Sequence, residues 1–182
     1  MGLDMYLEKK TLVKNYEHFI QSQKTNVVVT GCKAKYIKPE RISDIIEELI
    51  YWRKANQIHA WFIENCADGD ENKTKMDVSF DQLVELLAVC KKVEKASKLV
   101  KGKIINGYRY ENGKEVPIIE DGETIKNPAT AKKLLPVSEG FFFGSQQYDC
   151  YYLQDIKNTV RDLEAIIKEG DKLGDYQYIA SW

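Results

Sequence analysis

The fold is organised around one aromatic-rich stretch: Tyr51-Trp52-Arg53-Lys54-Ala55-Asn56-Gln57-Ile58-His59-Ala60-Trp61-Phe62-Ile63-Glu64-Asn65. It holds two of the three tryptophans and one of the two histidines of the 182-residue chain. Plotted as a helix at about 100° per residue, the stretch is apolar or aromatic around more than half of its circumference. Such a helix is typical of the centre of a fold. We therefore expect a central helix that begins just after residue 50.

The polar side of this expected helix carries Arg53, Asn56 and Gln57. These residues either line a pocket or touch a partner, or they form the solvated face of a core helix. The solvated face is the more common arrangement, because charged and amide side chains usually face water. His59 lies at the edge of the apolar side, where a histidine is more often a hydrogen-bonded core residue than a catalytic base.

The bulk composition indicates a globular protein. Hydrophobic residues make up 43% and charged residues 30% of the chain, which excludes disordered and membrane-embedded proteins. No apolar run approaches the roughly eighteen residues of a transmembrane helix, and the first residues are too polar for a signal peptide. The net charge of −1 argues against both a broad nucleic-acid-binding surface and a densely acidic DNA mimic. We expect one soluble, intracellular domain over residues 1–182.

The sequence shows no recognisable catalytic motif. It lacks a phosphate-binding loop, a dinucleotide fingerprint, a nucleophile elbow and a histidine pair with metal-ligand spacing. Asp68 and Asp70 match the first part of a calcium loop, but Lys73 stands where that loop needs glycine. The cysteines are widely spaced, which indicates reduced thiols and no zinc site: Cys32, Cys66, Cys90 and Cys150. We expect no catalytic residue, metal or cofactor.

Hydrophobic periodicity predicts most of the other elements. Alternating residues predict strands over 3–8 and 176–182, near the two ends of the chain. A capping box at Ser79–Gln82 opens an amphipathic helix that should end between residues 95 and 100. Another helix, for which Ser145 is a suitable cap, should run to Gly170.

Other segments give weaker patterns. The isoleucine-rich run 41–50 fits a helix or a buried strand, and residues 27–37 are compatible with a strand. A short helix should lie between Asn127 and Leu135, and Gly140–Gly144 should form an apolar strand. Together these patterns predict an α+β fold, in which a small, mostly antiparallel sheet packs against three main helices and carries a β-hairpin arm.

The expected arm is an insertion over residues 98–130. Three turn dipeptides divide it into β-prone runs and predict one or two short hairpins: Asn106-Gly107, Asn112-Gly113 and Asp121-Gly122. Basic residues and two tyrosines here could contact a nucleic-acid backbone and stack on bases. The candidate basic contacts are Lys101, Lys103 and Arg109. An ordinary solvated arm is the more common explanation.

Several stretches together resemble a family of short phage and prophage proteins. They are Met1-Gly2-Leu3-Asp4-Met5-Tyr6-Leu7, the central run from Tyr51 to Phe62, Leu135-Pro136 through Gly140-Phe141-Phe142-Phe143-Gly144, Tyr148-Asp149 and the ending Ser181-Trp182. The resemblance covers most of the chain outside roughly residues 98–130. At least one protein of this kind is counted among the type II anti-CRISPR proteins, which inhibit Cas9. No motif known to carry inhibition is present, so no functional residue is transferred.

The resemblance implies a phage-encoded anti-CRISPR protein that binds and inhibits Cas9 in the cytoplasm of a bacterial host, with or without nucleic-acid contact and without membrane contact. Cas9 holds nucleic acid in channels lined by arginine and lysine, and exposed acids could oppose such a channel. The candidate partner-binding residues outside the arm are Arg53, Asn56, Asp68, Asp70 and Glu71. Two alternatives are a small-ligand-binding or enzymatic accessory protein with a pocket near Arg53, Asn56 and His59, and a nucleic-acid-binding module acting through the arm.

Overall fold

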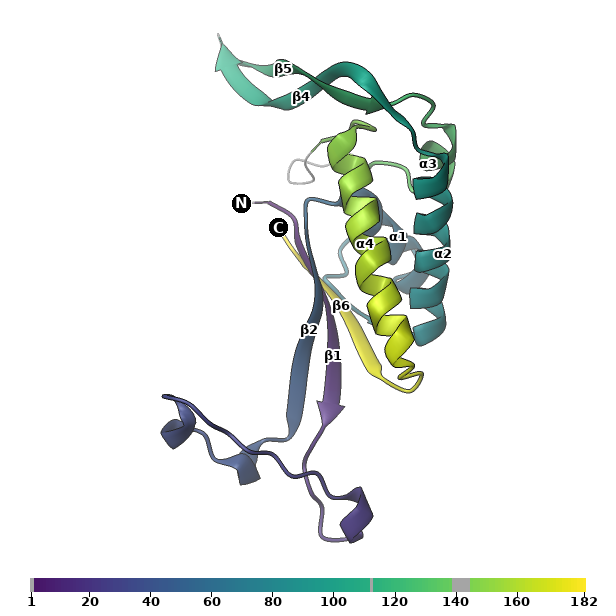
Figure 1. The fold of residues 1–182 in the computed structure, drawn as a ribbon. Helices are drawn as coiled ribbons and strands as arrows, with labels where there is room; N and C mark the ends of the chain where they lie inside the picture. The colour runs from purple at the N-terminus through teal and green to yellow at the C-terminus, as the bar shows by residue number, and fades with distance from the viewer. Residues whose placement is uncertain (1, 112, 139–144) are drawn as a thin grey trace.

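The computed structural model describes residues 2–111, 113–138 and 145–182 (Figure 1). In these ranges the chain forms four α-helices, three short 3-10 helices and six strands in two antiparallel sheets. The strands are β1 Asp4–Leu12, β2 Asp44–Arg53, β3 Lys75–Val78, β4 Leu99–Glu111, β5 Lys114–Ile125 and β6 Asp175–Ser181. The α-helices are α1 Asn56–Cys66, α2 Phe80–Ala96, α3 Ala129–Leu134 and α4 Cys150–Glu169. The expected α+β class is confirmed.

The main sheet has the strand order β2-β1-β6-β3 and is antiparallel throughout. The two strands predicted from alternation at the ends of the chain are confirmed, and they pair with each other at the centre of the sheet. Met5 of β1 lies opposite Trp52 on one side and Ala180 on the other. The buried residues of β1 alternate with partly exposed ones, and α1, α2 and α4 cover the buried face (Figure 1).

Aromatic side chains fill the core between this sheet and the helices. The rings of Phe62 in α1 and Tyr178 in β6 stack with their centroids 4.0 Å apart. Trp52 in β2 packs edge-on against Phe62, and its indole Nε1 donates a 2.8 Å hydrogen bond to Thr159 Oγ1 of α4. The core therefore joins residues from both halves of the chain.

The central stretch is a strand followed by a helix, so the expected helix from residue 51 is wrong at its start. Trp52 is buried while Tyr51 and Arg53 are exposed, which is the period of a strand. Lys54, with φ of 60°, turns the chain, and α1 begins at Asn56. The isoleucine-rich run 41–50 lies mostly in β2, so the strand alternative is confirmed, but this part of the strand is not buried, because Ile45 and Ile46 are 40% and 60% exposed.

The long connection between β1 and β2, residues 13–43, projects from one end of the molecule (Figure 1). Residues 27–37 form no strand in it, contrary to expectation. The side chain of Asn15 instead exchanges two 2.9 Å hydrogen bonds with the backbone of Thr25. The connection contains the three 3-10 helices, Gln21–Gln23, Ala34–Tyr36 and Pro39–Arg41.

The predicted capping box of α2 is confirmed, and α2 ends at Ala96, within the expected interval. The short helix after Asn127 is also confirmed, as α3. α4 ends at Gly170 as predicted, but its cap is Asp149 and not Ser145. Ile125 donates a 2.9 Å backbone hydrogen bond to Tyr148, which keeps the chain extended past Ser145 and delays the helix. The strand predicted for Gly140–Gly144 lies outside the described residues.

β4 and β5 form one long hairpin at the other end of the molecule (Figure 1). Two of the three predicted turn dipeptides lie within its strands. Asn106 and Gly107 form a bulge in β4, where the register shifts. Gly122 lies under Ile104, whose Cδ1 would be 2.6 Å from an added Cβ. Glycine at position 122 therefore provides close packing and not a turn.

Candidate functional site

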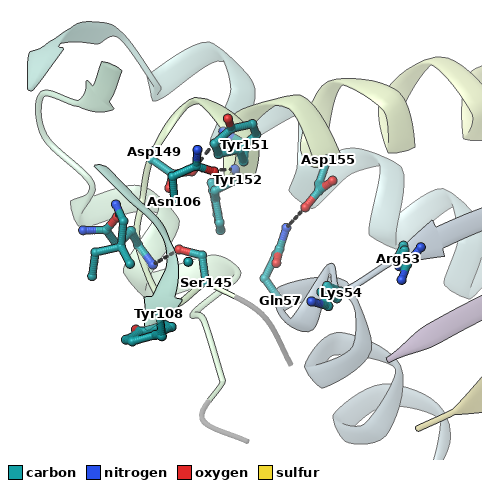
Figure 2. A pocket seen from close by; sticks show the side chains of 13 residues that line it. Arg53, Lys54, Gln57, Asn106, Tyr108, Ser145, Asp149, Tyr151, Tyr152 and Asp155 are labelled. Carbon is teal, nitrogen blue, oxygen red and sulfur yellow. Dashed lines mark hydrogen bonds between the residues drawn. The ribbon is translucent and has the colours of Figure 1, made fainter. Parts of the chain in front are cut away.

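A pocket of about 490 Å³ lies where the base of the hairpin meets the start of α4 and the corner between β2 and α1 (Figure 2). We call it the hairpin-base pocket. Its lining residues are Arg53, Lys54, Gln57, Ile105, Asn106, Gly107, Tyr108, Ser145, Gln147, Asp149, Tyr151, Tyr152 and Asp155. Its volume lies within the range of small-molecule sites, about 300–1,000 Å³.

The hairpin wall of the pocket is the bulge in β4. Gly107 has φ of 126°, a conformation that L side chains rarely adopt, so glycine makes this bulge possible. The side chain of Gln147 accepts a 2.7 Å hydrogen bond from the backbone nitrogen of Ile105. Asn106 donates a 2.8 Å hydrogen bond to Glu120 across the hairpin. These contacts fix the hairpin wall relative to the segment that leads into α4.

Asp149 forms the deepest acidic part of the pocket. Its Oδ1 caps α4 by accepting hydrogen bonds from the backbone nitrogens of Tyr151 and Tyr152, at 2.9 and 3.0 Å. The residue is completely buried, and its Oδ2 has no hydrogen-bond partner among the described residues. A buried acceptor without a donor costs about 1–3 kcal/mol, so such groups are rare in folded proteins.

Asp155 is the second carboxylate in the pocket. Its Oδ2 accepts a long hydrogen bond, 3.4 Å, from Nε2 of the buried Gln57 (Figure 2). Burial raises the pKa of Asp155 to about 6, and the negative charge of Asp149 adds to this rise, while the bond from Gln57 opposes it. The two carboxylates therefore share one electrostatic environment.

The opposite rim of the pocket is positive. Arg53 and Lys54 follow each other at the end of β2, and Figure 2 shows Arg53 on the far side of the Gln57–Asp155 pair from Asp149. The Arg53 side chain is 65% exposed, and its Nε lies 3.9 Å from the carboxylate of Asp4. A molecule in the pocket would therefore meet acidic groups at one end and basic groups at the other.

Asn56 was expected on the polar, outward side of the central helix as a partner-binding residue. The structure shows that this expectation is wrong. Asn56 is only 1% exposed and lies outside the lining of the hairpin-base pocket. Its Nδ2 donates to the carbonyl oxygen of Ser145 and its Oδ1 accepts from the backbone nitrogen of Ser138, both at 3.0 Å. Asn56 is buried because it begins α1 under these two backbone segments, and its role here is structural.

His59 is a core residue, as the more common interpretation predicted. It is 3% exposed, and its Nδ1 lies 2.8 Å from the hydroxyl oxygen of Tyr178. Burial lowers its pKa to about 4, so the imidazole is neutral at pH 7. His59 lines a separate cavity of about 200 Å³ and not the hairpin-base pocket. Of the three residues expected around a ligand, only Arg53 reaches that pocket.

No family model, curated protein or solved structure matches the chain. Among the described residues, no helix is long and apolar enough to cross a bilayer. The same part of the chain contains no group of three histidine, cysteine, aspartate or glutamate residues arranged to hold a metal ion.

The other candidate residues lie away from the pocket. Asp68, Asp70 and Glu71 are exposed in the loop after α1. The 11 residues of α1 separate this loop from the Asn56 end by about 16 Å, at 1.5 Å per residue. The structure thus gives two distinct surfaces and does not unite the candidates in one site.

The three basic candidates of the arm are exposed along β4. Lys103 pairs with Asp121 at 2.7 Å, and Arg109 pairs with Glu111 at 3.0 Å. Lys101 lies near the hairpin base. In sequence, residues 99–125 contain four basic residues (Lys101, Lys103, Arg109, Lys114) and five acidic ones (Glu111, Glu115, Glu120, Asp121, Glu123). The hairpin is therefore not a basic surface.

Sequence reasoning missed Asp149, Asp155 and Gln147 as pocket residues. The position of Asp149 as a helix cap could have been predicted from the sequence, because aspartate directly before a periodic apolar run is a typical cap. Asp155 lies on the polar side of that run and resembles any solvated helix acid in sequence. Gln147 has no distinguishing pattern. These three side chains lie on one segment, and they become pocket walls only because the hairpin and the corner between β2 and α1 pack beside it.

Proposed function

We propose that this protein is a phage-encoded, non-catalytic binding protein that inhibits Cas9 in the cytoplasm of a bacterial host. The resemblance described above supplies the partner. The observation that carries a binding function is the exposed face of the projecting β4–β5 hairpin. Tyr108, Tyr110 and Ile119 are 56%, 71% and 61% exposed there.

These three residues form one surface. Tyr108 and Tyr110 are two residues apart in β4, and Tyr108 lies opposite Pro117, which is two residues before Ile119 in β5. Residues at such positions share one face of a two-stranded ribbon. Tyrosine is enriched at the centres of protein interfaces, because it buries a large area and loses little side-chain entropy.

The hairpin base is anchored, so this surface is held out in a defined direction. Ile104 and Ile125 are both 5% exposed at the base, and Gln147 binds the backbone of Ile105. An isolated two-stranded ribbon is only marginally stable, so the distal face gains order when a partner covers it. A large protein such as Cas9 is a suitable partner for an extended surface of this kind.

The hairpin supports contact with protein better than contact with nucleic acid. Affinity for phosphate backbones comes from unpaired positive charge, whereas Lys103 and Arg109 are paired with carboxylates. The hairpin sequence also holds one more acidic than basic residue, which disfavours binding to a phosphate backbone. Cas9 itself, with or without guide RNA, is therefore the proposed contact.

The direct test is Cas9 cleavage of a plasmid in the presence of the purified protein. We expect cleavage to stop at modest molar excess, and Tyr110→Ala to weaken inhibition. The matched control is Tyr36→Ala in the 13–43 connection, because Tyr36 is 76% exposed and Tyr110 is 71% exposed. Full cleavage at saturating protein would contradict Cas9 inhibition. Equal inhibition by the two variants would contradict a role for the hairpin face.

A pull-down with purified Cas9 separates protein contact from nucleic-acid contact. We expect the protein to be retained by Cas9 both with and without guide RNA. Retention only in the presence of guide RNA would move the contact to the nucleic acid or to a surface that the RNA creates. No retention in either case would rule out direct binding to Cas9.

A further inference from the structure

The hairpin-base pocket shares Tyr108 with the proposed contact face, but its acidic groups lie away from that face and point to a ligand of their own. Asp149 lines the pocket and is fully buried, with one carboxylate oxygen satisfied by the helix cap and the other without a donor among the described residues. An oxygen in this situation is stabilised by any donor that reaches it. A charged donor gives roughly twice the stabilisation of a neutral one.

Asp155 places a second carboxylate on the wall of the same pocket. Among the described residues, its side chain accepts only the long, 3.4 Å hydrogen bond from Gln57, so it retains most of its capacity to accept hydrogen bonds. Asp149 and Asp155 repel each other electrostatically, which is part of the reason that the pKa of Asp155 is raised. A cation between them would remove this repulsion.

We propose that the hairpin-base pocket binds a small molecule through a protonated nitrogen, an ammonium or guanidinium group, held by the carboxylates of Asp149 and Asp155. Tyr152 and the bulge of β4 form the walls beside this group. The arrangement resembles other small-molecule sites in having a few convergent polar groups within a partly apolar cavity. This inference is independent of Cas9 inhibition.

The positive rim sets a limit on the ligand. Arg53 and Lys54 border the pocket beyond the Gln57–Asp155 pair (Figure 2). Lys54 repels a second positive charge and attracts a carboxylate or another anionic group, and Arg53 contributes less because Asp4 partly neutralises it. The ligand class that fits both ends is therefore a small molecule with a cationic group at one end and a carboxylate at the other, as in a basic amino acid, with the side-chain cation at the acidic end of the pocket.

Calorimetry and ligand-observed NMR with three related probes test this assignment on the full chain. L-arginine carries a guanidinium at one end and a carboxylate beside its α-ammonium at the other. Agmatine lacks the carboxylate, and L-citrulline keeps the shape and the amino-acid end of arginine without the guanidinium charge. We expect arginine to bind with a Kd of about 1 mM or tighter, agmatine more weakly, and citrulline at least roughly tenfold more weakly than arginine.

Two variants connect binding to the carboxylates. Asp149→Asn keeps an oxygen for the helix cap and replaces the other oxygen with a donor, and Asp155→Asn removes the second charge without changing the size of the side chain. We expect each to weaken arginine binding roughly tenfold or more. Asp162→Asn is the matched control, because Asp162 lies on α4 outside the pocket and pairs with Arg161.

Three results would overturn the proposal. The first is no binding of arginine or agmatine at about 10 mM, ten times the expected Kd, by the folded protein. The second is equal binding of citrulline and arginine, because the guanidinium charge would then play no part. The third is unchanged arginine binding by Asp155→Asn, which stays informative even if Asp149→Asn fails to fold. Cas9 inhibition is measured separately and is unaffected by any of these outcomes.

Discussion

Trp52 of β2 and Thr159 of α4, 107 residues apart in sequence, are joined by a buried 2.8 Å hydrogen bond from the indole nitrogen to the hydroxyl oxygen. The same hydroxyl donates to the backbone carbonyl of Asp155 at 2.8 Å. Thr159 is fully buried, so its hydroxyl links the sheet to the helix that supports one wall of the hairpin-base pocket.

Thr159→Val should therefore lower the free energy of unfolding by about 1–3 kcal/mol, because it leaves the buried indole nitrogen of Trp52 without an acceptor. Urea denaturation followed by tryptophan fluorescence measures the change. In a Trp52→Phe background the same substitution should be less costly, because the donor is already gone. A Thr159→Val variant as stable as the wild type would show that this bond contributes nothing.

Asp155→Asn should stabilise the protein at pH 7 by at most about 3 kcal/mol, since the pKa of Asp155 rises from 3.8 to about 6 on folding. The folded state then binds more protons than the unfolded state between these values, so the contribution of Asp155 to stability falls as pH rises through this window. The charged groups near it are Asp149, Arg53 and Lys54. Urea denaturation at pH 4 and pH 7 should show the gain only at pH 7, and a gain of equal size at both would contradict it.

The contribution of His59 to stability should depend on pH in the opposite direction to that of Asp155. The pKa of His59 falls from 6.5 to about 4 on folding, so the folded state binds fewer protons between these values. Its contribution to stability therefore rises with pH across this window. In His59→Gln, stability should rise less steeply from pH 4 to pH 6.5 than in the wild type, as measured by urea denaturation. Identical slopes would show that His59 titrates normally in the folded protein.

Asp149→Asn should fold with stability close to that of the wild type or above it. Asparagine and aspartate are equally good helix caps, and the substitution removes a buried negative charge that repels Asp155. Asp149→Ala loses the cap to Tyr151 and Tyr152 and should cost about 0.5–2 kcal/mol. Thermal unfolding of both variants measures the difference. A large loss of stability in Asp149→Asn would contradict this expectation, because it would mean that the folded protein needs the negative charge at position 149.

The four cysteines should react with iodoacetamide at different rates in the folded protein. Cys32 is exposed and should react first. Burial raises the pKa of Cys66 to about 11 and that of Cys90 to about 12, so both have very little thiolate at pH 8. Peptide mass spectrometry after timed labelling gives the order, and labelling in urea is the control. Fast modification of Cys90 would contradict its burial.

The sequence predicted elements whose pattern is local. Alternation identified the strands that became β1 and β6, and the Ser79–Gln82 capping box identified the start of α2. The prediction for the central stretch was wrong at its start, because the first residues of the stretch fit the period of a helix as well as that of a strand. Pairing of Trp52 with Met5 across the sheet decided in favour of a strand, and such pairing is not encoded within the stretch itself.

The candidate site depended on contacts that no local pattern contains. The polar side of the expected helix predicted Arg53, which does line the pocket, but the same hypothesis included Asn56 and His59, which are buried in the core. Asp149 and Asp155 become neighbours of Arg53 only because α4 packs over the corner between β2 and α1. A helix period shows which side of a helix is polar, but not which other segment faces that side.

The position of β6 determines when the main sheet can form. This strand is the last in sequence order, yet it lies between β1 and β3. While a ribosome is still adding residues before 175, β1 has only β2 as a neighbour and β3 has none. Tyr178, against which Phe62 stacks, is also still missing from the core at that stage. The main sheet can therefore close only after β6 has left the ribosome, and a nascent chain stalled in α4 leaves the β6-facing edges of β1 and β3 open to a chaperone.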